Sequence, residues 1–116
     1  MPGRDWRFRL DHIVEAIDYI LGYTQGLTFE QFCQNSMAVH ATIHNFEIVG
    51  EAARNVPQAL KDQHPEVPWQ DMIDMRNVVA HHYFGIELTI IWRTIQNNLP
   101  PLAIQIRDIL DSHDDV

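Results

Sequence analysis

Residues 71–85 read DMIDMRNVVAHHYFG and place four polar side chains within eight residues of a mostly apolar run: Arg76, Asn77, His81 and Tyr83. If the run is helical, each residue turns by about 100°, so Asn77 and His81 are neighbours one turn apart. Arg76 and Tyr83 are seven positions apart and point in nearly the same direction. We therefore expect a polar cluster, able to hold a phosphate or move a proton, near the C-terminal end of a helix.

The apolar pattern predicts helices on both sides of this stretch as well. Apolar residues recur at helical spacing over 5–25, 37–55, 69–83 and 87–111. Thr28 and Gln31 have the spacing of a capping box, which predicts a short helix over 29–34. The last pattern continues in phase through Pro100 and Pro101, which predicts one kinked helix or two nearly collinear helices. With 57–68 as a loop that can hold one turn, the expected fold class is an all-α bundle of four to five helices.

The helix expected over 37–55, with Ser36 as its cap, is apolar on two sides, which is typical of a central helix. A polar stripe with spacings of 4, 3, 4 and 3 runs between these sides: His40, His44, Glu47, Glu51 and Arg54. In a central helix such groups are expected to be partly buried and to satisfy one another, because an unpaired buried charge is costly.

Three interpretations of the stripe stay open. The favoured one is a structural network or a polar seam between two copies of the chain. In the second, the stripe contacts and orients the cluster around Arg76. The residues concerned are in particular His44, Glu47, Glu51 and Arg54. The third is a metal site made by His40, His44 and Glu47, for which no second helix with a matching ligand pattern is evident.

Size and composition fit a single domain over residues 1–116. A single cysteine, Cys33, excludes an internal disulfide and suits the cytoplasm, where we expect the protein to act. No signal-peptide pattern or uncharged apolar stretch of about 20 residues appears, so no membrane association is expected. The net charge of −8 opposes broad binding of nucleic acid, so an RNA-binding site must concentrate its few arginines locally or use a basic partner.

Several of these patterns together resemble a known family. Arg76-Asn77-x-x-x-His81-x-Tyr83 resembles the R-x4-H-x-Y motif of HEPN-domain proteins, specifically their HepT-like (DUF86) branch. Residues 46–53, FEIVGEAA, resemble the "GEA" stretch upstream of that motif in the same branch. Trp92 followed by residues 97–102, NNLPPL, resembles the pattern of its last helix. The resemblance extends from about Arg7 to Leu110.

This resemblance implies a HEPN-type bundle that forms a symmetric dimer, with a cleft where the two motif helices meet. It implies a metal-independent endoribonuclease that needs no cofactor and acts as the toxin of a type VII-like toxin–antitoxin pair. The partner would be a minimal nucleotidyltransferase that neutralises the toxin by adenylylating Tyr83. The chain itself would form a homodimer, or a higher hetero-oligomer together with this partner. By position in the motif, Arg76, Asn77 and His81 are the catalytic candidates, and Tyr83 would contact RNA.

The residue types suit this chemistry. Histidine can act as base or acid near neutral pH, and arginine grips phosphate with two donors. One chain has only one motif histidine, so a symmetric dimer is needed to supply both an acid and a base. Two alternatives remain: a non-catalytic nucleotide- or partner-binding subunit, antitoxin-like, of the same pair, and a metal-dependent enzyme using His40, His44 and Glu47.

Overall fold

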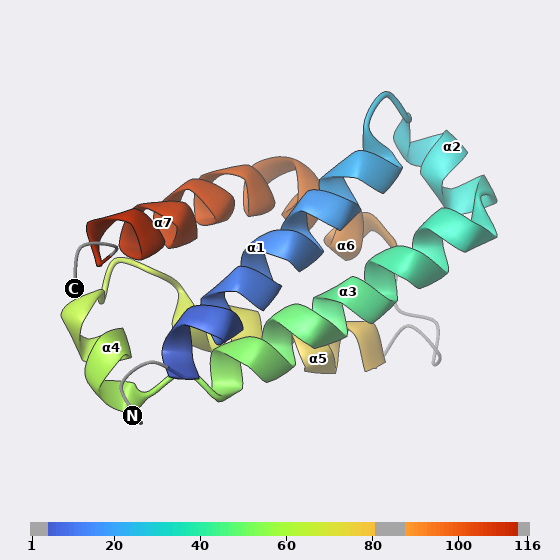
Figure 1. Ribbon diagram of the computed structural model, residues 1–116. Coiled ribbons are helices and arrows are strands. Elements are labelled where there is room, and N and C mark those ends of the chain that lie inside the picture. The colour runs from blue at the N-terminus through green and yellow to red at the C-terminus, as the bar shows by residue number, and fades with distance from the viewer. Residues whose placement is uncertain (1–4, 81–87, 114–116) are drawn as a thin grey trace.

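The computed structural model describes residues 5–80 and 88–113, which form seven helices and no strand (Figure 1). They are α1 (Asp5–Thr24), α2 (Phe29–Gln34), α3 (Ser36–Arg54), α4 (Gln58–Gln63), α5 (Trp69–Ala80), α6 (Leu88–Asn97) and α7 (Leu99–Ser112). Five of these helices have ten or more residues, while α2 and α4 have six each. The predicted all-α class is confirmed, and α4 is the turn of helix anticipated between 57 and 68. Nowhere in these two ranges does a helix combine the length and apolarity needed to cross a bilayer.

Helix α3 is central, as its two apolar sides predict. It packs against α1 on one side and α5 on the other, while α7 packs against α1 (Figure 1). The shorter α6 packs against α7 and α2. The largest fully buried side chains come from all of these long helices and include Ile13, Ile17, Phe46, Val49, Met72, Ile95 and Ile106. The core therefore fixes α5, which carries Arg76, against α3.

The polar stripe on α3 is exposed, so the prediction that it would be partly buried is wrong. His40, His44, Glu47, Glu51 and Arg54 all lie at the surface. The reason is geometric: α1 and α5 cover the two apolar sides of α3 and leave the side between them open to solvent. Met37, near the start of the same helix, is 82% exposed. The stripe is thus available to a ligand or a second chain.

Side-chain caps define the start of α2 and of α3. The Thr28 hydroxyl accepts a hydrogen bond from the Gln31 amide at 3.1 Å, and the Gln31 side chain accepts one from the Thr28 amide at 2.9 Å. This confirms the predicted capping box. The expected cap of α3 is corrected from Ser36 to Asn35, whose Oδ1 accepts from the Ala38 amide at 3.0 Å. Asn35 has a non-helical backbone, as a cap requires, whereas Ser36 is already helical.

The last segment forms two successive helices, one of the two predicted arrangements. The break falls at Asn98, before the prolines, and Pro100 and Pro101 lie in the first turn of α7. Amides there have no intrahelical acceptor, so the missing proline N–H groups cost nothing. The buried face continues in phase across the break through Ile91, Ile95, Leu99, Leu102 and Ile106.

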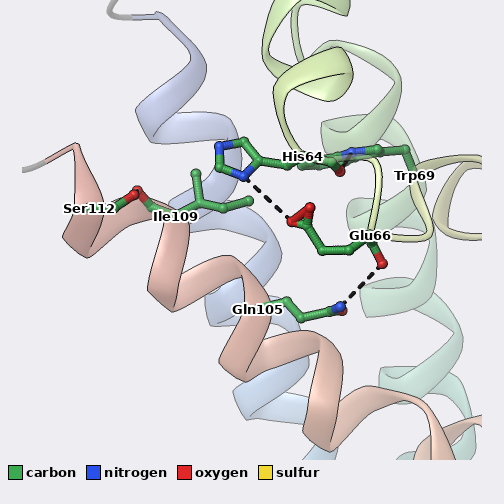
Figure 2. A network of polar contacts seen from close by, with 6 residues as sticks. All are labelled: His64, Glu66, Trp69, Gln105, Ile109 and Ser112. Atoms are coloured by element: carbon green, nitrogen blue, oxygen red, sulfur yellow. Dashed lines mark hydrogen bonds and ion pairs between the residues drawn. The ribbon is translucent and has the colours of Figure 1, made fainter.

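A polar network joins the loop between α4 and α5 to α7 (Figure 2). The Trp69 indole N–H donates to the His64 carbonyl at 2.9 Å, and the Gln105 side-chain amide donates to the Glu66 carbonyl at 3.2 Å. The His64 Nδ1 lies 3.5 Å from the Glu66 carboxylate. Because Trp69 is the first residue of α5, these contacts fix the start of that helix relative to α7.

Aromatic and ionic contacts hold other parts of the bundle together. The Trp92 ring of α6 packs on Phe32 of α2, with ring centroids 5.2 Å apart. The Trp6 ring of α1 meets His113, just after α7, edge to face at 5.1 Å. Between α1 and α7, Arg107 donates to both carboxylate oxygens of Asp18, at 2.6 and 2.8 Å. Trp92, quoted above for the resemblance, therefore has a packing role.

Candidate functional site

Helix α5 presents Arg76 and Asn77 to solvent. Met72, Met75 and Val79 on the same helix are buried in the core, and this fixes the rotation of α5 about its axis. Both polar residues are consequently exposed near the C-terminal end of the helix. His81 and Tyr83, the other two residues of the motif, lie outside the described residues, so their predicted positions are untested.

The guanidinium of Arg76 is paired with a carboxylate of the polar stripe. Arg76 Nη1 donates to Glu51 Oε2 at 2.7 Å, although the two residues are 25 positions apart in sequence. The other oxygen of Glu51 accepts a hydrogen bond from the Asn55 side-chain amide at 3.2 Å. About half of each side chain of the pair is exposed, 45% for Arg76 and 54% for Glu51. An exposed ion pair adds at most about 1 kcal/mol to stability, so its main effect is to orient Arg76.

Gly50 provides the space through which Arg76 passes. A Cβ atom at position 50 would lie 2.5 Å from Arg76 Cγ and 3.1 Å from the Met72 carbonyl oxygen. The first distance is shorter than real Cβ contacts allow and the second is tighter than most of them, so any larger residue would push away the Arg76 side chain or separate α3 from α5. The consecutive residues Gly50 and Glu51 thus admit the aliphatic part of Arg76 and hold its charged end.

Three members of the stripe and Arg76 surround one open pocket. The pocket has a volume of about 240 Å³ and is lined by His44, Glu47, Ile48, Glu51 and Arg76. The structure therefore places His44, Glu47 and Glu51 at the same pocket as Arg76. Arg54 and His40 do not line the pocket. In the described ranges no side-chain hydrogen bond or ion pair joins one stripe residue to another, so the stripe side chains do not form an internal network.

The metal-site interpretation gains no support from the geometry. Within residues 5–80 and 88–113, no group of three or more histidine, cysteine or acidic side chains is arranged to hold a metal ion. His40, His44 and Glu47 lie along a single exposed helix face. A tetrahedral site needs ligands from more than one direction, and no second described helix supplies one.

Sequence reasoning did not identify the roles of Gly50 and Asn55. Gly50 stands in the quoted FEIVGEAA stretch, but only the distance between α3 and α5 shows why a glycine is needed there. Asn55 follows α3 and bonds both the carbonyl and the carboxylate of Glu51, at 2.8 and 3.2 Å. In the sequence, the role of Asn55 is indicated only by its amide side chain and by its position four residues after Glu51.

Comparison with known proteins gives consistent matches. The family model described as "Ribonuclease HepT-like" matches residues 13–109. A "Putative RNase" of Caldanaerobacter subterraneus subsp. tengcongensis is 35% identical over 101 residues, covering 87% of this chain and 90% of the relative. A "Probable ribonuclease HepT" of Thermococcus cleftensis is 39% identical over 93 residues, covering 80% and 84%. A "Putative RNase" of Methanocaldococcus jannaschii is 36% identical over 110 residues, covering 95% and 91%. No solved structure matches the chain.

Proposed function

Because the chain belongs to the HepT-like ribonuclease family, we propose that it is an endoribonuclease that cleaves RNA without a metal ion. The active site would be a cleft between two copies of the chain, formed by the motif helices. Arg76, Asn77 and His81 of each copy would contact the substrate.

The observation that carries this proposal is the way Arg76 is held. Glu51 and Gly50 direct the guanidinium to the edge of an open pocket, rather than leaving it to move freely in solvent. A guanidinium has five N–H donors, and the contact with Glu51 leaves most of them for another acceptor. A phosphate with two oxygens facing the guanidinium is the ligand that such a fork binds best.

The proposed reaction uses the ribose 2′-hydroxyl as nucleophile. A base removes its proton, the oxygen attacks the adjacent phosphorus, and an acid protonates the departing 5′-oxygen. His81 of one copy would act as the base and His81 of the other as the acid, because one histidine cannot fill both roles in a single step. Arg76 would stabilise the negative charge that develops on the phosphorane, and Asn77, exposed beside it, would donate to a phosphate oxygen or orient His81.

Control of this activity would come from a minimal nucleotidyltransferase that transfers AMP to Tyr83. The modification would add a phosphodiester charge and a purine next to the site of phosphate binding. Both would exclude RNA, by repulsion and by bulk. In this scheme the chain is the toxin of a toxin–antitoxin pair, in agreement with the sequence resemblance.

A specific observation also favours the second candidate, a non-catalytic subunit that binds a nucleotide or a basic partner. The chain carries a net charge of −8, and two carboxylates, those of Glu47 and Glu51, line the Arg76 pocket. Repulsion between these groups and an RNA backbone would weaken RNA binding, whereas a basic protein surface would be attracted.

One experiment separates the two candidates. Purified wild-type protein, His81→Ala and the control His40→Ala are incubated in EDTA with tRNA and mRNA, and the products are resolved on a gel. His40 is an exposed histidine that does not line the Arg76 pocket, so His40→Ala should cleave like wild type. The ribonuclease proposal expects cleavage that survives EDTA and disappears in His81→Ala.

Absence of cleavage by wild type is followed by measurement of its intact mass. A mass increased by one AMP on Tyr83 would mean that the protein was purified in its neutralised form. An unmodified and inactive protein would contradict the ribonuclease proposal and support the binding subunit. Cleavage that persists in His81→Ala would contradict the assignment of His81.

A further inference from the structure

A second cavity lies beside the Arg76 pocket, between α1 and α3. Its volume is about 280 Å³, and its lining consists of His12, Glu15, Ala16, Tyr19, Asn45 and Ile48. Ile48 lines both this cavity and the Arg76 pocket, so the two hollows are neighbours separated by one side chain. A chain-like ligand held at Arg76 can therefore reach the second cavity across α3.

Asn45 gives this cavity a fixed hydrogen-bond acceptor. The residue is only 5% exposed, and its Nδ2 donates to the Ala41 carbonyl at 2.9 Å. That bond uses one of the two N–H groups of the side chain, while the carbonyl Oδ1 accepts no hydrogen bond from any described residue. A buried amide that is held in one orientation with a vacant acceptor favours a ligand that can donate an N–H.

Tyr19 gives the cavity an aromatic wall. The residue is 50% exposed, and its ring lies nearly parallel to that of Tyr23, with an angle of 9° and a centroid distance of 6.2 Å. The stacked neighbour limits the directions in which the Tyr19 ring can turn. Exposed aromatic rings of this kind are the surfaces on which unpaired RNA bases stack. Ala16 and Ile48 complete an apolar lining that suits the face of a base.

We propose that this cavity binds a nucleobase of the RNA strand whose phosphate is held at Arg76, an inference that rests on the proposed function. The base stacks on Tyr19 and donates an exocyclic amino group to Asn45 or to the Glu15 carboxylate. The Glu15 carboxylate can only accept, and Asn45 Oδ1 can accept as well, which favours adenine, cytosine and guanine, the bases that carry an exocyclic amino group. Uracil is disfavoured, because it has no exocyclic amino group and carries two exocyclic carbonyl oxygens, which the carboxylate repels.

The charges around the cavity fix the orientation of the strand. Among the residues that the structure describes, no lysine or arginine lines this cavity, and Glu15 would repel a phosphate. The bases must therefore face α1 and α3, with the phosphates turned toward solvent except at Arg76. It follows that Tyr19 contributes to affinity without contributing to the dependence of binding on salt, whereas Arg76 contributes to both.

The test measures binding of the full chain to fluorescent hexamers of 2′-O-methyl A, C or U by anisotropy. Methylation blocks the attacking oxygen, so binding is measured without cleavage. The A and C hexamers should bind more tightly than the U hexamer. Tyr19→Ala should weaken A and C binding by about tenfold, within the range that stacking provides, and should leave the salt dependence unchanged. Tyr19→Phe should bind like wild type.

Two further variants complete the design. Asn45→Ala should reduce the preference for C over U, and its circular dichroism should be checked because Asn45 is buried. Phe29→Ala is the control, since Phe29 is an exposed aromatic residue that lines neither pocket and should not affect binding. Equal affinities for the three hexamers, or an unchanged affinity in Tyr19→Ala, would overturn the inference.

The outcome is independent of that for the ribonuclease. If RNA cleavage depends on His81 but hexamer binding is unchanged in Tyr19→Ala, the base-site proposal is contradicted and the ribonuclease proposal is supported. If hexamer binding depends on Tyr19 but the protein does not cleave RNA, the base-site proposal is supported and the ribonuclease proposal is contradicted. Binding of none of the hexamers would overturn the base site, because Tyr19 would then have no base to stack against.

Discussion

Arg76 of α5 crosses α3 at Gly50, where a Cβ atom would come within 2.5 Å of its Cγ. The next residue, Glu51, receives the guanidinium at 2.7 Å. Two consecutive positions of α3 therefore determine where the aliphatic part and the charged end of one arginine lie. If Arg76 binds the phosphate of RNA, its orientation is set by α3 before the substrate arrives, which reduces the entropy lost on binding.

Gly50→Ala should abolish most of the activity while leaving the chain folded. Alanine has a higher helix propensity than glycine by roughly 0.5–1 kcal/mol, but its Cβ would displace Arg76. Gly22→Ala in α1 is the matched control, because no atom lies within 4 Å of the added Cβ there. Unfolding in urea and the rate of RNA cleavage are measured for both variants.

In that comparison, Gly22→Ala should be slightly more stable than wild type and equally active. Gly50→Ala should show a cleavage rate lowered by at least about tenfold, the factor that about 1.4 kcal/mol of lost transition-state binding produces. Full activity in Gly50→Ala would mean that the position of Arg76 is unimportant for the reaction.

Glu51→Gln should separate orientation from charge. The amide keeps an oxygen that can accept from Arg76, but the loss of the negative charge leaves the guanidinium more attractive to RNA. We expect kcat to fall about tenfold, with KM unchanged or lower, when kinetics are measured with a defined RNA. Asn55→Ala, which removes only the support of Glu51, should have a smaller effect in the same direction. A higher KM with unchanged kcat would instead show that Glu51 contributes to substrate binding.

Trp69→Phe should destabilise the chain by about 1–2 kcal/mol, because it removes a hydrogen bond to the His64 carbonyl as well as ring volume. Gln105→Ala removes another bond of the same network, but that bond is exposed, so the cost should stay below about 0.5 kcal/mol. Urea denaturation followed by circular dichroism measures both. Similar costs for the two variants would show that the buried indole is not the dominant link.

Asp18→Asn should lower the free energy of unfolding by no more than about 1 kcal/mol, since Asp18 and Arg107 are both about half exposed. The loss should diminish as NaCl is raised from 0.05 to about 1 M, because salt screens exposed charges. An effect that is independent of salt would indicate that the two hydrogen bonds act mainly through their geometry.

Much of the fold could be predicted from the sequence because it follows from local spacing. The 3.6-residue period locates the long helices, and the Thr28–Gln31 spacing locates α2 together with its cap. The predicted start of α3 lies one residue too late, since Asn35 and Ser36 are both good caps and only the backbone distinguishes them. The exposure of the stripe could not be predicted, because spacing defines the sides of a helix but not which of them a neighbour covers.

The candidate site was predictable only in part. The motif pointed to Arg76 and Asn77, and the stripe pointed to Glu51, but the contact between Arg76 and Glu51 joins positions 25 residues apart. Such a contact depends on how closely α3 and α5 approach, which Gly50 permits and no periodicity reveals. The assignments of His81 and Tyr83, outside the described residues, stay predictions.

The three tryptophans occupy three separate junctions: Trp6 next to His113, Trp69 at the start of α5 and Trp92 on Phe32. Each indole is therefore a built-in fluorophore for a different part of the bundle. Variants that retain one tryptophan at a time would resolve the order in which these junctions come apart during unfolding. The Trp6 ring meets His113 edge to face, with ring centroids 5.1 Å apart. Its emission would report the pairing of the two ends of the chain without an attached dye.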